Sequence, residues 1–219
     1  MKFDIRKYYD SIDHQILYEL CKKAFVQNED VLHLIKVIID SYGFEEEKGI
    51  PLGNQTSSWF ALYYLDGLDR LIKEKLQIKY YSRYMDDGII IHRNKDYLKY
   101  CLKQMEQYVQ QERKLEFNQK TQIVPMSQGV DYLGFHFYLT ETGKVIRRLR
   151  TSNKKRMKRK LKRFRHAYRE GKITQEAVHR SLVSYCGHLS HGNTYHLRNT
   201  LLNHLILTKS KEEQTDEQN

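Results

Sequence analysis

Two β-rich runs that lie only three residues apart constrain the fold of this chain most. The runs are Ile78–Tyr84 and Gly88–His92, and Met85, Asp86 and Asp87 stand between them. A connection this short joins antiparallel neighbours, so the pattern predicts a β-hairpin with two acids at its tip.

Hydrophobic patterning predicts the elements around this hairpin. Before it we expect a strand at 2–6 and helices at 11–25, 30–42 and 56–75, the last entered through a loop that contains Gly49, Pro51 and Gly53. After it we expect a helix at 95–113 and strands near Ile123, at 131–139 and at 144–148, with Thr-Glu-Thr-Gly as the last turn. The predicted fold class is α+β, with a largely antiparallel sheet backed by helices.

From about residue 151 the sequence predicts helices only. An apolar stripe marks the first of them, and two more are expected at 173–189 and 195–207. We therefore expect a domain at 1–150, a basic helical module at 151–208 and a disordered polar tail at 209–219.

The charge of the chain is concentrated in one stretch. Residues 144–172 hold fifteen Lys or Arg and one acid, Glu170, in a chain whose net charge is +11. A short basic run is usually a solvated helix face, but this density of like charge would repel strongly in isolation. The stretch therefore predicts a nucleic-acid partner contacted through its phosphates.

Other functional classes are excluded by composition. No apolar run approaches the roughly 18 residues of a membrane span, and the start is too charged for a signal peptide, so we expect a cytoplasmic protein with no membrane partner. Cys21, Cys101 and Cys186 lack the spacing of a disulfide framework or a zinc site. His188, His191 and His196 stand beside glycines and are interpreted as part of a turn.

Three acids form the candidate catalytic group. Asp4 ends the first predicted strand, and folding can bring it to Asp86 and Asp87 at the hairpin tip. Carboxylates crowded at strand ends repel unless a cation neutralises them, which favours a site for Mg²⁺, with Mn²⁺ as a substitute. Two such ions would support nucleotidyl transfer. On the tip alone, ordinary turn acids explain Asp86 and Asp87 equally well.

Five motifs follow one another along the chain, namely Asp4-Ile-Arg-Lys-Tyr-Tyr-Asp-Ser-Ile-Asp-His, Gly49-Ile-Pro-Leu-Gly-Asn-Gln-Thr-Ser, Tyr84-Met-Asp-Asp, Phe117-Asn-Gln-Lys-Thr and Tyr132-Leu-Gly-Phe. Their order resembles that of reverse transcriptases, in particular those of bacterial retroelements such as group II introns and diversity-generating retroelements. The resemblance implies a polymerase palm with an antiparallel sheet, followed by a helical thumb.

The resemblance also implies roles for individual residues. Asp4, Asp86 and Asp87 would bind the metal ions, and the carbonyl of Ile5 would complete their coordination. Tyr9 would lie against the incoming sugar and exclude a ribose 2′-hydroxyl, which requires the chain to turn soon after Asp4, since strand periodicity places residues 4 and 9 on opposite faces.

Further roles follow from the later motifs. Gly53 and Asn54 would approach the nascent base pair, and Lys120 would act on the pyrophosphate leaving group. The segment Tyr132–Phe135 would position the primer end. Each role has a structural alternative: Gly53 and Asn54 could form a simple helix-entry turn, Lys120 could be a solvated side chain, and Tyr132–Phe135 could be a plain core hairpin. Arg6 and Arg83 would balance the charge of the acids or contact phosphate.

Two features depart from the family pattern. Retroviral enzymes carry glutamine at the position of Leu52, and the change to leucine resembles the enzymes of diversity-generating retroelements. Ser58, however, departs from the glutamine that those enzymes usually show after the serine. Family members also carry a fingers region before the first motif, and almost nothing precedes Asp4. A fragment, a split-gene product or a degenerate copy would explain this, and a fingers-bearing partner chain is an expected partner.

The sequence thus predicts an RNA-directed DNA polymerase whose partners are an RNA template, a DNA or RNA primer and deoxynucleoside triphosphates. One alternative is a truncated or partner-dependent, non-catalytic protein that binds RNA or DNA and keeps the palm fold. Another is template-independent nucleotide addition, which would use the same acids.

Overall fold

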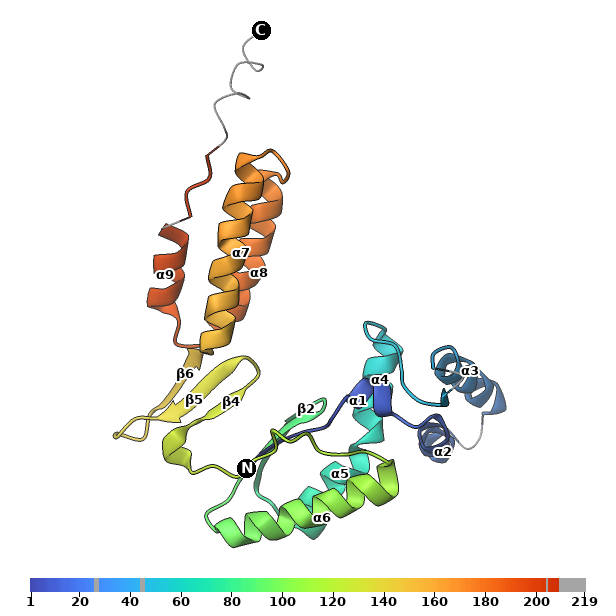
Figure 1. Cartoon of the computed structure of the whole chain (residues 1–219). Coiled ribbons are helices and arrows are strands. Elements are labelled where there is room, and N and C mark those ends of the chain that lie inside the picture. The colour runs from blue at the N-terminus through green and yellow to red at the C-terminus, as the bar shows by residue number, and fades with distance from the viewer. Residues whose placement is uncertain (26–27, 44–45, 204, 209–219) are drawn as a thin grey trace. The chain divides into compact units, whose positions relative to one another are not determined.

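The computed structural model describes residues 1–25, 28–43, 46–203 and 205–208. It divides into an N-terminal unit, Met1–Val124, and a C-terminal unit, Pro125–Asn219. Both units combine helices with an antiparallel sheet, so the predicted α+β class is confirmed (Figure 1).

The N-terminal unit is built on a three-stranded sheet. Strands β1 (Lys2–Asp4), β3 (Asp87–Ile91) and β2 (Tyr80–Tyr84) lie in that order, and each neighbouring pair is antiparallel. The β2–β3 hairpin is the one that the sequence predicts. The helices are α1 (Tyr8–Ser11), α2 (His14–Ala24), α3 (Glu29–Asp40), α4 (Gln55–Tyr64), α5 (Asp66–Arg70), the π-helical turn η2 (Leu71–Lys75) and α6 (Lys95–Arg113).

Helix α6 confirms the predicted bounds because local signals set both of its ends. The side chain of Asn94 accepts hydrogen bonds from the amides of residues 96 and 97, and Lys114 ends the helix in a left-handed conformation. Between these ends, the buried residues Leu98, Cys101, Met105 and Val109 recur at helical spacing and join the core of the unit.

Three predictions for the N-terminal unit are wrong, two in the bounds of a helix and one in the existence of a strand. The helix predicted at 11–25 begins at His14, because the Asp13 side chain caps its first turn. The helix predicted at 56–75 is interrupted at Leu65, which leaves helical geometry and is fully buried in the core. No strand forms at Ile123 within the described chain, where pairing with β1 is limited to an isolated bridge from Lys2 to Gln122.

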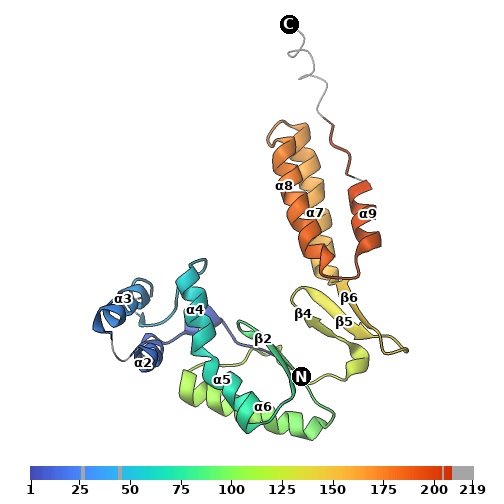
Figure 2. The same ribbon diagram turned by 180° about the vertical axis from the view of Figure 1, so that it is seen from behind.

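The C-terminal unit places a second antiparallel sheet beside three helices. Its strands are β4 (Val130–Tyr132), β5 (Phe135–Leu139) and β6 (Val145–Leu149), in that order, after a 3₁₀ turn, η3 (Met126–Gln128). The helices are α7 (Thr151–Arg169), α8 (Gln175–Ser190) and α9 (Tyr195–Asn203), and they lie side by side (Figure 2). Their core is small and centres on the buried residues Met157, Leu161 and Leu189.

Turn geometry corrects the predicted strand 131–139. Leu133 and Gly134 both have positive φ, 46° and 85°, so the chain reverses there and splits the segment into β4 and β5. The helix predicted at 195–207 ends at Asn203. The predicted tail, 209–219, lies outside the described residues.

The compact units divide between Val124 and Pro125, whereas the sequence predicts a domain limit near 150, where strands give way to helices. The two divisions measure different things, packing and element type, and the limit at 150 stays a prediction. No described helix is both long enough and apolar enough to cross a membrane.

Candidate active site

Strand register brings the predicted acids to one edge of the N-terminal sheet. Asp4 is the last residue of β1 and pairs directly with Asp87, the first residue of β3. Asp86 precedes it in the hairpin turn. Like charges opposite one another in a sheet destabilise it, so this pairing favours a positive partner at the same edge.

The backbone at the hairpin tip is held in an unusual conformation. Met85 has φ 52°, in the left-handed region that residues other than glycine rarely adopt. Gly88 follows the two acids because the Phe3 ring covers it, and a Cβ there would lie 2.2 Å from Cζ of Phe3. The tip is therefore specified by packing as well as by its own turn residues.

The electrostatics of the three acids differ. Burial raises the pKa of the Asp86 carboxyl, its own backbone amide lowers it, and the charges of Asp4 and Asp87 raise it further, leaving the pKa above its ordinary value. Asp87 instead pairs with Lys2, whose Nζ lies 3.1 Å from Oδ1. The negative charge concentrated around Asp86 is what a bound cation would relieve.

The chemistry of these donors fits a hard divalent cation, since all three are carboxylates. Across the described part of the chain, no three His, Cys, Asp or Glu side chains are grouped closely enough to hold a metal ion. Ile5 is buried and faces Phe117 in a bridge formed by the neighbouring Asp4 carbonyl and Arg6 amide, so its own carbonyl is not used there.

Tyr9 lies at the hairpin tip because the chain turns after β1. Lys7 has φ 44° and starts the short helix α1, which is the early turn that the sequence analysis required. The Tyr9 hydroxyl lies 3.8 Å from Sδ of Met85. Tyr8 is 2% exposed and donates a hydrogen bond to the Ala61 carbonyl, so Tyr8 is the core residue of the two.

The loop before α4 is tied to the same region. The amide of Ile50 donates to the Tyr9 carbonyl at 3.0 Å, and that of Gly49 donates to the Ile12 carbonyl at 2.8 Å. Gly53, with φ 98° and open space around it, and Asn54, the N-cap residue of α4, are both exposed. The structure thus places these two residues in an open loop whose base contacts the Tyr9 segment.

Lys120 lies in a segment that is hydrogen-bonded to Asp4. The amide of Asn118 donates to the Asp4 carbonyl at 2.7 Å, and the amide of Asp4 donates to Oγ1 of Thr121 at 3.3 Å. The Lys120 side chain is exposed, while its amide donates to the Asn118 side chain at 3.1 Å. Its backbone is therefore fixed beside β1 while its ammonium group faces solvent.

The two arginines that flank the acids have different surroundings. Arg6 forms an exposed ion pair with Glu116 at 3.4 Å. The Arg83 side chain is 7% exposed and pairs with Asp69 of α5, a residue that the sequence did not single out. The alternation of β2 could have indicated such a partner, because it places Tyr81 and Arg83 on the same face of the strand. Polar side chains that are removed from water together need a hydrogen-bonding partner.

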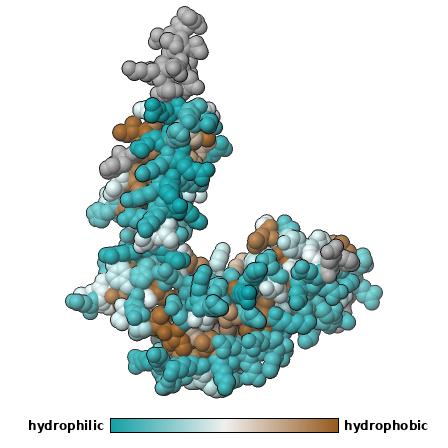
Figure 3. Space-filling model, viewed as in Figure 1, coloured by the Kyte–Doolittle hydropathy of each residue, from teal (hydrophilic) through white to brown (hydrophobic). Residues whose placement is uncertain are grey.

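The C-terminal unit carries the basic stretch. Helix α7 buries Met157 and Leu161, whereas hydrophilic side chains cover much of the surface around it (Figure 3). Two cations of the stretch lie over aromatic rings: Nζ of Lys160 is 5.3 and 5.0 Å from the ring centroids of Phe164 and Tyr185, and Cζ of Arg148 is 5.0 Å from that of Tyr138. The His188 ring packs on Phe135, with ring centroids 5.0 Å apart.

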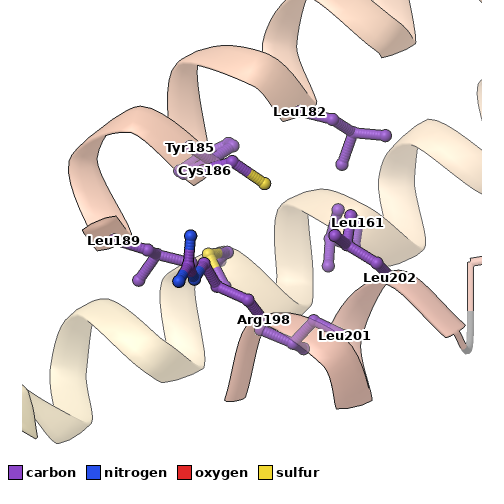
Figure 4. A pocket seen from close by; sticks show the side chains of 9 residues that line it. Leu161, Leu182, Tyr185, Cys186, Leu189, Arg198, Leu201 and Leu202 are labelled. Carbon is purple, nitrogen blue, oxygen red and sulfur yellow. The ribbon is translucent and has the colours of Figure 1, made fainter. Parts of the chain in front are cut away.

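A small cavity among α7, α8 and α9 is apolar. Leu161, Leu182, Leu189 and Leu201 surround a volume of about 20 Å³, with the Arg198 side chain reaching among them (Figure 4). A space of this size holds at most a water molecule. It is a packing gap and offers no room for a nucleotide.

Comparison with protein families identifies the N-terminal part of the chain. Residues 1–137 match the family model described as reverse transcriptase (RNA-dependent DNA polymerase). The match contains Asp4, Asp86, Asp87 and Lys120 and extends into β5. No curated protein matches the chain.

Proposed function

The chain belongs to the reverse transcriptase family, and from this membership we propose that it is an RNA-directed DNA polymerase that adds deoxynucleotides to a primer 3′-hydroxyl on an RNA template. The observation that supports this proposal best is the pairing of Asp4 with Asp87 next to Asp86. On the first two motifs we assign it to the bacterial retroelement type, with a palm at 1–150 and a thumb at 151–208.

The acids would bind two Mg²⁺ ions, and the Ile5 carbonyl would add a neutral oxygen ligand. Bound there, the ions would supply charge neutralisation for the attacking and leaving oxygens. The carboxylates of Asp4 and Asp86 are the principal ligands in this proposal, while Asp87, which pairs with Lys2, contributes least directly.

Residues around the acids would select and orient the nucleotide. The ring of Tyr9 is held at the hairpin tip through its contact with Met85, and in that place it would exclude a ribose 2′-hydroxyl. Gly53 and Asn54 would approach the nascent base pair from the open loop, since glycine allows close approach of the backbone. This gives a preference for deoxynucleotides.

Lys120 would act on the leaving group. Its segment is hydrogen-bonded to the backbone of Asp4. Its exposed ammonium group could donate a proton to pyrophosphate or stabilise the negative charge of that leaving group. The thumb would hold the template and primer through phosphate contacts from α7, which carry no sequence preference and so permit translocation.

The test is deoxynucleotide incorporation on a primed RNA template with Mg²⁺, by the chain and by its Asp86→Ala, Asp87→Ala double variant. We expect extension by the chain and none by the variant, with equal binding of the primed template. A parallel reaction without template separates templated synthesis from template-independent addition. Ribonucleotides in place of deoxynucleotides test Tyr9, and a Tyr9→Ala variant should accept them better.

One observation favours a second candidate function. Asp87 pairs with Lys2, and the described acids do not converge into a preformed metal centre. A partner-dependent or non-catalytic nucleic-acid-binding protein that keeps the palm fold would have this arrangement. This second function is preferred if neither the unmodified chain nor the Asp86→Ala, Asp87→Ala variant extends the primer while both bind it with a steep dependence on salt.

A further inference from the structure

The side chain of Arg83 connects helix α5 to the tip of the acid hairpin. Its Nε donates to Oδ1 of Asp69 at 2.8 Å, and its Nη2 pairs with the other oxygen of the same carboxylate. The third nitrogen, Nη1, donates to the Met85 carbonyl at 2.7 Å. One planar group thus fixes both a carboxylate and a turn carbonyl, in directions that only the guanidinium fork provides.

Asp69 is itself fixed in place. The Tyr81 hydroxyl donates to Oδ1 of Asp69 at 2.6 Å, so two residues on one face of β2 bind the same carboxylate. Burial lowers the pKa of Arg83, but the hydrogen bonds and charge of Asp69 outweigh burial and leave the pKa above its ordinary value. Arg83 is therefore a permanent cation whose direction is set from α5.

The carbonyl that Arg83 binds belongs to the strained residue of the turn. Left-handed geometry is unfavourable at a residue other than glycine and persists only where the surroundings hold it. Met85 adopts this geometry, and its carbonyl shares a peptide plane with the amide of Asp86. That amide lowers the pKa of the Asp86 carboxyl, so the peptide and the carboxylate interact.

We propose that Arg83, held by Asp69, is a positioning residue that fixes the Met85–Asp86 peptide and thereby the direction of the Asp86 carboxylate. The proposal rests on the proposed function in one respect, namely that Asp86 binds the catalytic metal ions. Arg83 does not contact substrate in this arrangement, because its three nitrogens are used inside the unit.

The test compares Arg83→Lys and Asp69→Asn with a matched control on the same helix. The control is Arg70→Lys with Asp66→Asn, because those two residues form an exposed ion pair at 2.9 Å, four positions apart on α5. Lysine keeps the charge of Arg83 but cannot bind two groups in a fixed fork. A merely electrostatic role would therefore survive Arg83→Lys.

The first readout is hydrogen exchange at the amides of residues 84–88, which requires no activity. We expect roughly tenfold faster exchange there in both Arg83→Lys and Asp69→Asn, with exchange in α6 and in the control unchanged. Unchanged exchange at the tip of a folded Arg83→Lys protein would overturn the proposal. Faster exchange throughout the N-terminal unit would also overturn it, because the pair would then serve overall stability.

The second readout is the metal dependence of the same proteins. We expect weaker Mn²⁺ binding by calorimetry, a higher Mg²⁺ concentration for half-maximal extension, and a kcat lowered roughly tenfold or more with little change in KM for the primed template. The Arg83→Lys, Asp69→Asn double variant should lose no more activity than the less active of the two single variants, since both substitutions act through one contact. If the unmodified chain extends no primer, the proposed function fails while hydrogen exchange still decides the positioning role.

Discussion

The two units of this molecule carry equal numbers of basic residues and use them differently. The N-terminal unit has 19 basic and 19 acidic residues, and the C-terminal unit has 19 basic and 8 acidic residues. In the first, individual charges have individual partners, such as Lys2 with Asp87 and Arg83 with Asp69. In the second, cations crowd one helix. Single residues should therefore decide the chemistry, whereas nucleic-acid binding should depend on the sum of many.

The hydrophobic cores of the two units also differ, in how many side chains a long helix buries in each. Helix α6 buries four apolar side chains against a continuous core, whereas α7, of the same length, buries Met157 and Leu161. A long helix with so few buried residues is stabilised by few contacts. The C-terminal unit should therefore be the less stable of the two.

The largest expected effect sharpens the contrast in charge. Asp4→Asn should lower primer extension roughly 10³-fold or more. The metal ions that Asp4 would bind stabilise the transition state by several kcal/mol. Binding of the primed template and its salt dependence should stay unchanged. The control is Asp10→Asn, an exposed acid on α1, which should keep full activity. Loss of binding in Asp4→Asn would mean that the acids and the basic helix are not independent.

The next effect tests the contrast in packing. Leu161→Ala should destabilise the C-terminal unit by about 3 kcal/mol, because the site is 8% exposed in a small core. Urea unfolding followed by circular dichroism measures this loss. Fluorescence of Trp59, the single Trp of the chain, follows the N-terminal unit alone and should not shift. Val183→Ala, exposed on α8, is the control, and a shift of both probes together would show that the units unfold as one.

A smaller, graded effect should follow from the basic helix. Replacing Lys155, Arg159 and Lys162 with Gln, all exposed on α7, should weaken binding of a primed RNA roughly tenfold and reduce the salt slope by two to three. Filter binding at several salt concentrations measures both. Removing the same charge at Lys22, Lys23 and Lys103 of the N-terminal unit is the control. Equal losses in the two triple variants would contradict a division of labour between the units.

The smallest effect is a pH dependence within the N-terminal unit. Burial alone would raise the pKa of Asp13, but hydrogen bonds from Lys114 and the Ile16 amide outweigh it and lower the pKa below its ordinary value. The stability that Asp13 contributes is therefore present near neutral pH and lost as pH falls below about 4. Asp13→Asn should cost about 1 kcal/mol at pH 7 and flatten the acid limb of urea midpoints. Asp10→Asn, at an exposed acid of α1, should leave that limb unchanged.

Comparison of particular elements shows where sequence reasoning succeeds. The β2–β3 hairpin and α6 were predicted well, because alternation, a capping residue and helical spacing are local signals. The long helix at 56–75 and the strand at 131–139 were predicted as continuous, and both are broken. At Leu65 the break accompanies a fully buried side chain, and at Leu133 and Gly134 positive φ angles form a turn, so packing in one case and turn geometry in the other override the apolar pattern.

The sequence by itself determined that two acids lie at a hairpin tip, that Asp4 follows the first strand residues, and that a helix carries the basic residues. Residue type and spacing are enough to predict these three features. Only the tertiary structure decided that Asp4 faces Asp87, that Tyr9 rather than Tyr8 reaches the tip, and that Asp69 holds Arg83 against the Met85 carbonyl. These contacts join residues that are far apart in the chain or that local patterns leave equivalent. Register, burial and hydrogen-bond direction settle them, and these exist only once the chain is packed.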